Sequence, residues 1–300
     1  MHPEDETSTT HHEPIILAEC EVAPTAIETD SVKDRRRIAE MANKAYRRAS
    51  AKSNVLSRTK LADIALVSMD EISIGKWLGK GSFSDVHEIS KIMLDDEVTI
   101  KHTENGTKVA RNILSNNYLR EEKVDGKTIS TCRYAVKFLK KDLRKNNKRY
   151  AVGTTDLVVE GLFLASLTHP NIIKIRGLPD GGVHSMIDNG GEDGTGYFLV
   201  MDRLFSTLSE RIYQQWATEH NDVRYARKDI VIDRLFKHRM REDMNSDLAV
   251  RVKVAFDIAA ALKYLHEKNI IYRDLKPENL GFDGQFLLLL LLLFGSFTLH

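Results

Sequence analysis

Hydrophobic and polar positions follow two different periods along the chain. Short apolar runs bounded by glycine and polar clusters predict strands at residues 72–78, 85–89, 134–139, 172–177 and 196–201. Apolar residues at three- and four-residue steps predict helices at residues 156–167, 206–216 and 247–268. The fold class is therefore α+β, with a small antiparallel sheet and one helix first and a helical part after it.

The helix predicted at residues 247–268 has the clearest pattern in the chain. Its apolar positions are Leu248, Ala255, Ile258, Ala259, Leu262 and Leu265, and Asn269 can end it. The polar run that follows contains Asp274, Lys276 and Asn279, which a tight loop can bring to one small site. Phosphoryl transfer uses this set: the Asp accepts a hydroxyl proton, the Lys neutralises phosphate charge, and the Asn holds a metal ion.

Lys137 lies on the strand predicted at residues 134–139, on the face that would turn inward. A lysine in that position costs desolvation free energy unless it has a partner. Glu160, on the helix predicted at residues 156–167, can face it. Gly161 in the same helix costs about 1 kcal/mol relative to alanine, which predicts a helix that is easily displaced.

The run Tyr272–Asn279 resembles the catalytic loop of eukaryotic protein kinases. Motifs upstream of this run resemble other motifs of that family and occur in the same order along the chain. A glycine turn spans residues 79–84, Lys137 follows on a strand, and Glu160 stands nine residues before His169-Pro170-Asn171. Together these motifs are far more specific than any one of them alone.

The resemblance spans Ile72 to Asn279, and Lys276, two residues after the Asp, is the pattern of serine/threonine kinases. It implies a protein-kinase-like two-lobe fold, in which the small lobe is an antiparallel sheet with one helix and the large helical lobe is incomplete. The expected parts are a disordered leader at 1–70, a small lobe at 71–201 with an insertion at about 95–131, and the hinge and truncated large lobe at 202–300.

The resemblance implies that ATP and Mg²⁺ are the cofactors. The nucleotide site would comprise Leu78, Gly79, Gly81, Ser84, Val86, Ala135, Lys137, Glu160, Met201, Asp202 and Leu204. Ser84 stands where the family has a third glycine, which should stiffen the turn. Met201 would lie behind the adenine, and backbone groups of Asp202 and Leu204 would bind the adenine edge.

The catalytic loop would carry the remaining functional residues. By resemblance, Asp274 orients or deprotonates the substrate hydroxyl, Lys276 neutralises phosphate charge, and Asn279 holds magnesium. Arg273 would brace the loop. Tyr272 replaces the histidine that commonly precedes this arginine and would pack in the interior.

The sequence departs from the family pattern after Asn279. Leu293 stands where the metal-binding Asp belongs, and a leucine cannot coordinate magnesium. Gly281 replaces a bulkier apolar residue that would form the adenine floor. Few residues follow to build a substrate platform, so the outer face of the helix at 247–268 is expected to be an uncovered apolar patch. The leucine run 287–293 is well short of the ~20 residues that span a bilayer, and favours a buried strand or an aberrant tail.

Composition adds few constraints. The chain has 300 residues, 42% of them apolar, and a formal charge of +1, so no global field favours nucleic acid or an anionic membrane. Its two cysteines, Cys20 and Cys132, lack metal-ligand spacing and indicate a reducing interior. The N-terminus has no secretory signal, so an intracellular location, cytoplasmic or nuclear, is expected.

Two segments are rich in basic residues and could each bind a partner. Residues 33–48 form a possible short basic helix that could address the nucleus, an acidic lipid surface or a partner, although a solvated charged helix is the simpler interpretation. Residues 224–241 interleave cations with apolar residues and could dock an acidic partner or RNA. No nucleic-acid motif accompanies them, so a charged insertion is favoured.

Three hypotheses for function follow. The first is a serine/threonine kinase acting on protein substrates, whose sequence is incomplete here. The second is a catalytically inactive kinase-like module that binds a scaffold or partner kinase. The third is a basic interaction protein built on the two basic segments, which the ordered motifs make the weakest of the three.

Overall fold

The computed structural model describes residues 30–52, 64–95, 105–124, 127–184, 196–216, 235–283, 288–290 and 297–299. Several predictions fall outside these residues. They concern the first part of the leader, most of the basic segment at 224–241, Cys20 and Leu293.

A six-stranded sheet forms the centre of the first half of the molecule. Its strands, in the spatial order β1-β7-β8-β6-β3-β2, are β1 (Ala65–Val67), β7 (Ile175–Pro179), β8 (Phe198–Asp202), β6 (Tyr134–Leu139), β3 (Ser84–Ile92) and β2 (Ile72–Lys80). Neighbours are antiparallel except β1 and β7, which run parallel. The predicted α+β class is confirmed.

Both faces of this sheet are covered. Ala135 and Leu139 of β6 pack in one hydrophobic cluster with α4 (Asn147–Ser166). Val136 and Phe138, on the opposite face, pack in a second cluster with Leu114 of α3 (Asn105–Asn116). Strand side chains alternate between faces, so a strand with a cover on each side is apolar at most of its positions.

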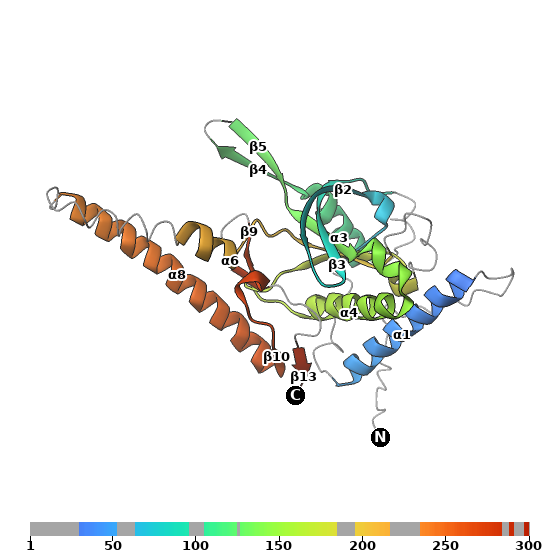
Figure 1. Cartoon of the computed structure of the whole chain (residues 1–300). Coiled ribbons are helices and arrows are strands. Elements are labelled where there is room, and N and C mark those ends of the chain that lie inside the picture. Colours follow the sequence, from blue (N-terminus) through green and yellow to red (C-terminus); the bar gives the residue numbers. More distant parts are fainter. Residues whose placement is uncertain are drawn as a thin grey trace, which may run out of the picture.

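The predicted insertion lies between β3 and β6. It contains α3 and a two-stranded hairpin of β4 (Leu119–Val124) and β5 (Lys127–Cys132), which projects from the body in Figure 1. Short helical turns connect other elements: η4 (Met69–Glu71), η5 (Lys141–Lys145) and η6 (Gly182–His184).

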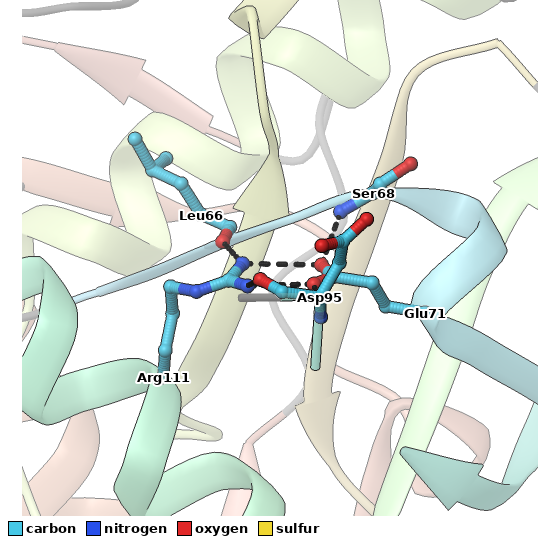
Figure 2. Close-up of polar contacts among 5 residues, drawn as sticks. All are labelled: Leu66, Ser68, Glu71, Asp95 and Arg111. Atoms are coloured by element: carbon cyan, nitrogen blue, oxygen red, sulfur yellow. Dashed lines mark hydrogen bonds and ion pairs between the residues drawn. The ribbon is translucent and has the colours of Figure 1, made fainter. Parts of the chain in front are cut away.

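A buried ion pair that sequence reasoning missed fixes α3 against the sheet (Figure 2). The Glu71 carboxylate accepts hydrogen bonds from Arg111 Nη2 at 2.6 Å and Nη1 at 3.1 Å. It also accepts from the backbone N–H groups of Asp95 at 2.7 Å and Ser68 at 2.8 Å. Arg111 Nη1 donates to the Leu66 carbonyl as well. Because both charges are buried and well bonded, the pair joins α3, β1 and η4 into one unit.

The second half of the molecule is built on α8 (Leu235–Glu267), which runs as one long helix away from the sheet in Figure 1. Before it come β9 (Ser206–Thr207), α6 (Leu208–Glu210) and the π-helix η7 (Arg211–Trp216). After it come β10 (Ile270–Tyr272), η8 (Pro277–Asn279), β11 (Leu280–Phe282), β12 (Leu288–Leu290) and β13 (Phe297–Leu299). β11 pairs antiparallel with both β9 and β12, and β10 pairs antiparallel with β13.

The described part of the leucine run forms a strand. Leu289 of β12 is 4% exposed, which favours the buried-strand interpretation at this residue. None of the helices in the described ranges is long and apolar enough to cross a membrane.

The prediction of a disordered leader over residues 1–70 is wrong for residues 30–52 and 64–70. Residues 30–52 form the helix α1 (Asp30–Lys52), which lies against α4. Its side chains Ile38, Ala39, Ala42 and Tyr46 are buried in the main cluster. A narrow apolar stripe at three- and four-residue spacing is sufficient once a second helix covers it.

The helix carrying Glu160 is longer than predicted. α4 begins at Asn147, because the Asn146 side chain accepts a hydrogen bond from the Arg149 N–H at 3.0 Å and caps the helix. Gly161 also has a packing reason, since a Cβ there would lie 2.6 Å from Leu199 Cδ2 on β8. The predicted ease of displacing this helix stays a prediction.

The helix predicted at residues 247–268 begins twelve residues earlier and ends as expected. Asn269 adopts a left-handed conformation at φ 58°, which stops the helix. The outer face of α8 carries exposed apolar side chains, including Leu248 at 60%, Val252 at 58% and Phe256 at 70% exposure. The predicted uncovered apolar patch is present among the described residues.

Candidate active site

Lys137 and Glu160 form a buried ion pair. The register of β6 directs Lys137 toward α4, where its Nζ lies 2.6 Å from Glu160 Oε1 and 2.7 Å from Oε2. Both side chains are almost fully buried, at 6% and 4% exposure. Such a pair persists only where each charge satisfies the other, so its geometry is strongly determined by β6 and α4.

Asp156 adds a second carboxylate beside this pair. It lies one helical turn before Glu160 on α4 and is partly buried. Burial, and then the nearby Glu160 carboxylate, raise the pKa of Asp156 to about 6, while Lys137 opposes the shift. Sequence reasoning missed this residue, although its spacing from Glu160 could have drawn attention to it.

The glycine turn is closed by its own backbone. The Gly81 N–H donates to the Ser84 carbonyl at 2.7 Å, and Lys140 Nζ donates to the Gly81 carbonyl at 2.6 Å. A Cβ at Gly81 would lie 2.9 Å from Ser84 Oγ, so a side chain at this position would force the Ser84 hydroxyl to move. At Gly79 a Cβ would meet no atom within 4 Å, which leaves open space beside the backbone.

Phe83 ties the tip of the glycine turn to α4. A Cβ at Gly153 of α4 would lie 3.0 Å from Phe83 Cβ, so the aromatic side chain packs directly on the helix backbone. The buried Ser84 completes the turn in place of a third glycine. The turn is therefore held at both ends, and the stiffening expected from Ser84 stays a prediction.

The segment after β8 contains the predicted hinge. Met201 is 3% exposed and pairs with Ala135 across the strands, while Leu78 and Val86 pack against the same cluster. The Asp202 carboxylate is held by Arg176 at 2.7 and 3.0 Å. Among the backbone–backbone hydrogen bonds between described residues, Leu204 makes none.

The predicted catalytic loop brings Asp274, Lys276 and Asn279 together. Lys276 Nζ lies 3.0 Å from Asp274 Oδ2, and Asn279 Nδ2 donates to the same oxygen at 2.8 Å and to the Asp274 carbonyl at 2.9 Å. The hydrogen bond from Lys276, assisted by that from Asn279, lowers the pKa of Asp274 despite some opposing desolvation. Asp274 is therefore an anion at neutral pH. Arg273 is exposed at the edge of the loop.

Tyr272 connects the loop to the ion pair. Its side chain is buried at the end of β10, and burial raises the pKa of its phenol. A hydrogen bond with Asn279 opposes this shift, whereas the charges of Asp274 and Glu160 add to it. The charges of both carboxylates thus act on the Tyr272 phenol in the same direction.

A comparison with protein families identifies the group to which this arrangement belongs. The model of the protein kinase domain matches residues 124–295, more than half of the chain. The chain belongs to the protein kinase domain family. The matched range contains Lys137, Glu160 and the run Tyr272–Asn279.

Curated relatives of this kinase domain are serine/threonine kinases. Serine/threonine-protein kinase sgk-1 of Caenorhabditis elegans is 59% identical over 51 residues, which cover 17% of this chain and 11% of the relative. Human serine/threonine-protein kinase Sgk1 is 51% identical over 51 residues, which cover 17% of this chain and 12% of the relative. A probable serine/threonine-protein kinase of Dictyostelium discoideum is 24% identical over 142 residues, covering 46% and 17%. The chain thus spans less than a fifth of the length of these relatives.

The kinase site offers few metal ligands. Within the described ranges, no group of three or more His, Cys, Asp or Glu side chains is placed to hold a metal ion. Asn279 and Asp274 supply amide and carboxylate oxygens, the atom types that magnesium prefers. The donor set therefore fits magnesium in kind.

Proposed function

We propose that the chain is the nucleotide-binding and catalytic-loop portion of a protein serine/threonine kinase, which transfers the γ-phosphate of ATP to protein hydroxyls. The buried ion pair of Lys137 and Glu160 carries this proposal. The Lys137 ammonium lies in the middle of the sheet and is fixed by the carboxylate of Glu160. In this proposal it faces the loop that carries Asp, Lys and Asn. This arrangement suits phosphoryl transfer better than a structural role.

The small lobe of residues 71–201 would hold the nucleotide. In this proposal Lys137 contacts the phosphates, Gly79 and Gly81 let the backbone approach them, and the hinge backbone at Asp202 and Leu204 binds the adenine edge. The remaining predicted contacts to the nucleotide are Leu78, Ser84, Val86, Ala135, Glu160 and Met201.

The catalytic loop would act on the substrate hydroxyl. The hydroxyl oxygen bonds to the γ-phosphorus as the bond to ADP breaks, and Asp274 orients the hydroxyl and takes its proton. Lys276 neutralises charge on the transferred group, and Arg273 braces the loop. Asn279 would hold a magnesium ion, which supplies charge neutralisation on the phosphates when bound.

A second function is favoured by one observation, the replacement of the metal-binding Asp by Leu293. In this alternative the chain is an inactive kinase-like module that binds a scaffold or partner kinase. Protein substrates, such a scaffold, and a cytoplasmic or nuclear location belong to the proposal as well.

ATP binding and phosphoryl transfer separate these functions. The intact chain should bind ATP, and Lys137→Met should weaken binding at least tenfold, because the ammonium that meets the phosphates is lost. Lys263→Met, a change at an exposed lysine on α8, is the matched control and should have no effect. Failure of the intact chain to bind ATP would overturn the kinase proposal.

Transfer of radiolabelled phosphate to a generic protein substrate then decides between the two. A magnesium-dependent signal that Asp274→Asn removes supports the kinase. ATP binding without transfer, in a chain that remains folded, supports the inactive module.

A further inference from the structure

Leu204 occupies the space beside Gly281. A Cβ built on Gly281 would lie 2.6 Å from Leu204 Cδ1 and 3.1 Å from both Cδ2 and Cγ. Real Cβ atoms essentially never approach another heavy atom within 3.0 Å. The end of the leucine side chain therefore fills the position that any side chain at residue 281 would take.

The backbone keeps these two residues opposite each other. Gly281 pairs with Thr207 in the contact of β11 with β9, and the Phe205 N–H donates to the Phe282 carbonyl at 2.8 Å. Leu204 directly precedes this bonded residue, so its position over β11 does not depend on side-chain packing alone. Its side chain also packs against the main cluster, which includes Met201 and Ala135.

Leu204 is also the hinge residue whose backbone N–H and C=O make no backbone hydrogen bond among the described residues. One residue therefore combines backbone groups for the edge of a planar base with an apolar side chain beside them. A face over a base and polar groups at its edge are the two elements of a purine site.

We propose that the Leu204 side chain forms one face of the adenine site in place of a β11 side chain, and that it is a specificity-determining residue for the base. This inference rests on the proposed binding of ATP. Val86 and Ala135 would cover the other face. Because Gly281 offers no side chain of its own, removal of the leucine side chain opens the site with nothing to replace it.

A double-mutant cycle tests this assignment. The four proteins are the intact chain, Leu204→Ala, Gly281→Leu and the double variant, and the control is Leu248→Ala on the exposed face of α8. The probes are ATP and inorganic tripolyphosphate, which carries the phosphates without the base. Affinities are measured by titration calorimetry, and folding by thermal unfolding without ligand.

Leu204→Ala should weaken ATP binding about tenfold while leaving tripolyphosphate binding unchanged, because only the base loses a contact surface. Gly281→Leu should weaken ATP binding to a similar extent, since the new side chain collides with Leu204. In the double variant the side chain introduced at position 281 takes the vacated space. ATP affinity should then return to within about threefold of the intact chain, with Leu248→Ala unaffected.

Equal losses for ATP and tripolyphosphate, or additive losses in the double variant, would show that Leu204 acts only in packing and would overturn the assignment. Unfolding of Gly281→Leu does not remove the test, because the ratio of the two affinities in Leu204→Ala stands alone. If the intact chain binds tripolyphosphate but not ATP, the base site is refuted. If it binds neither, the proposed function itself fails, and the inference fails with it.

Discussion

Asp156 precedes Glu160 by one turn of α4, so two carboxylates act on the ammonium of Lys137. Glu160 makes both short contacts to that ammonium. Asp156 is left with desolvation and with the repulsion of Glu160, and its pKa rises to about 6. The pair that defines the site is therefore accompanied by a carboxylate that destabilises the fold when it is charged.

Replacing Asp156 with Asn should stabilise the protein at neutral pH. A folded-state pKa of about 6 against an ordinary value of 3.8 means that the folded state holds the proton more tightly. The contribution of Asp156 to the free energy of unfolding is most favourable below pH 3.8, its ordinary pKa. This contribution is lost as the pH rises through the folded-state pKa of about 6. With allowance for solvent screening of a half-exposed group, the gain of Asp156→Asn at pH 7 is about 1 kcal/mol.

Urea unfolding of the two proteins at a series of pH values measures this difference. The gain should shrink as the pH falls and be absent well below pH 3.8, where the Asp156 carboxyl is neutral in both the folded and the unfolded state. A gain that is independent of pH would contradict the assigned cause.

Replacing Lys276 with Gln should raise the pKa of Asp274 toward its ordinary value. The hydrogen bond from Lys276 is the largest cause of the lowered pKa in the intact protein. A carboxyl whose pKa is lowered in the folded state stabilises the protein at any pH above the ordinary pKa of that group. This stabilisation is lost as the pH falls through the folded-state pKa. In the variant this stabilisation should therefore be smaller, and its loss should be complete at a higher pH. Carbon-13 NMR of the Asp274 carboxyl follows the titration directly. Lys263→Gln on α8 is the control, and equal titration curves for all three proteins would refute the role of Lys276.

Replacing Arg111 with Met should destabilise the fold by about 3–5 kcal/mol, because the buried Glu71 carboxylate loses its counter-charge. Hydrogen exchange should accelerate first in α3, since the pair joins α3 to β1. Lys108→Met, at an exposed position of the same helix, should change stability by less than about 0.5 kcal/mol. Similar losses in the two variants would indicate that α3 is not held by the ion pair.

Replacing Ala42 with Glu should separate α1 from α4. Ala42 is 0% exposed, so the new charge would be buried without a partner, at a cost of about 3 kcal/mol or more. Met41→Glu, at the adjacent position that is 51% exposed, serves as the control and should be close to neutral. Chemical unfolding compares the two. Equal stability of both variants would show that α1 does not pack on α4 in solution.

Local sequence patterns were sufficient to predict the bounds of a helix or strand where those bounds are determined by its own residues. The strand at residues 134–139 has the predicted bounds, because every side chain is apolar or paired. The end of α8 follows from Asn269, which adopts the left-handed conformation that the pattern requires.

Tertiary contacts decided the features that the sequence did not reveal. The apolar stripe of α1 is too narrow to predict burial until α4 is known to cover it. In the sequence, Arg111 is one of many charged residues of the insertion. Its burial is explained only by the position of Glu71, which lies forty residues earlier in the chain. The proximity of Leu204 and Gly281 depends on the pairing of β9 with β11, which no local pattern specifies.

The parallel strand β1 has a practical consequence. It covers the outer edge of β7, with Ala65 opposite Gly177 and Val67 opposite Pro179. A recombinant fragment beginning near residue 70, as the sequence alone would suggest, would leave β7 as an open edge strand with unpaired backbone groups. Such an edge invites intermolecular strand pairing and precipitation. Residues 64–67 thus belong to any fragment designed to stay monomeric.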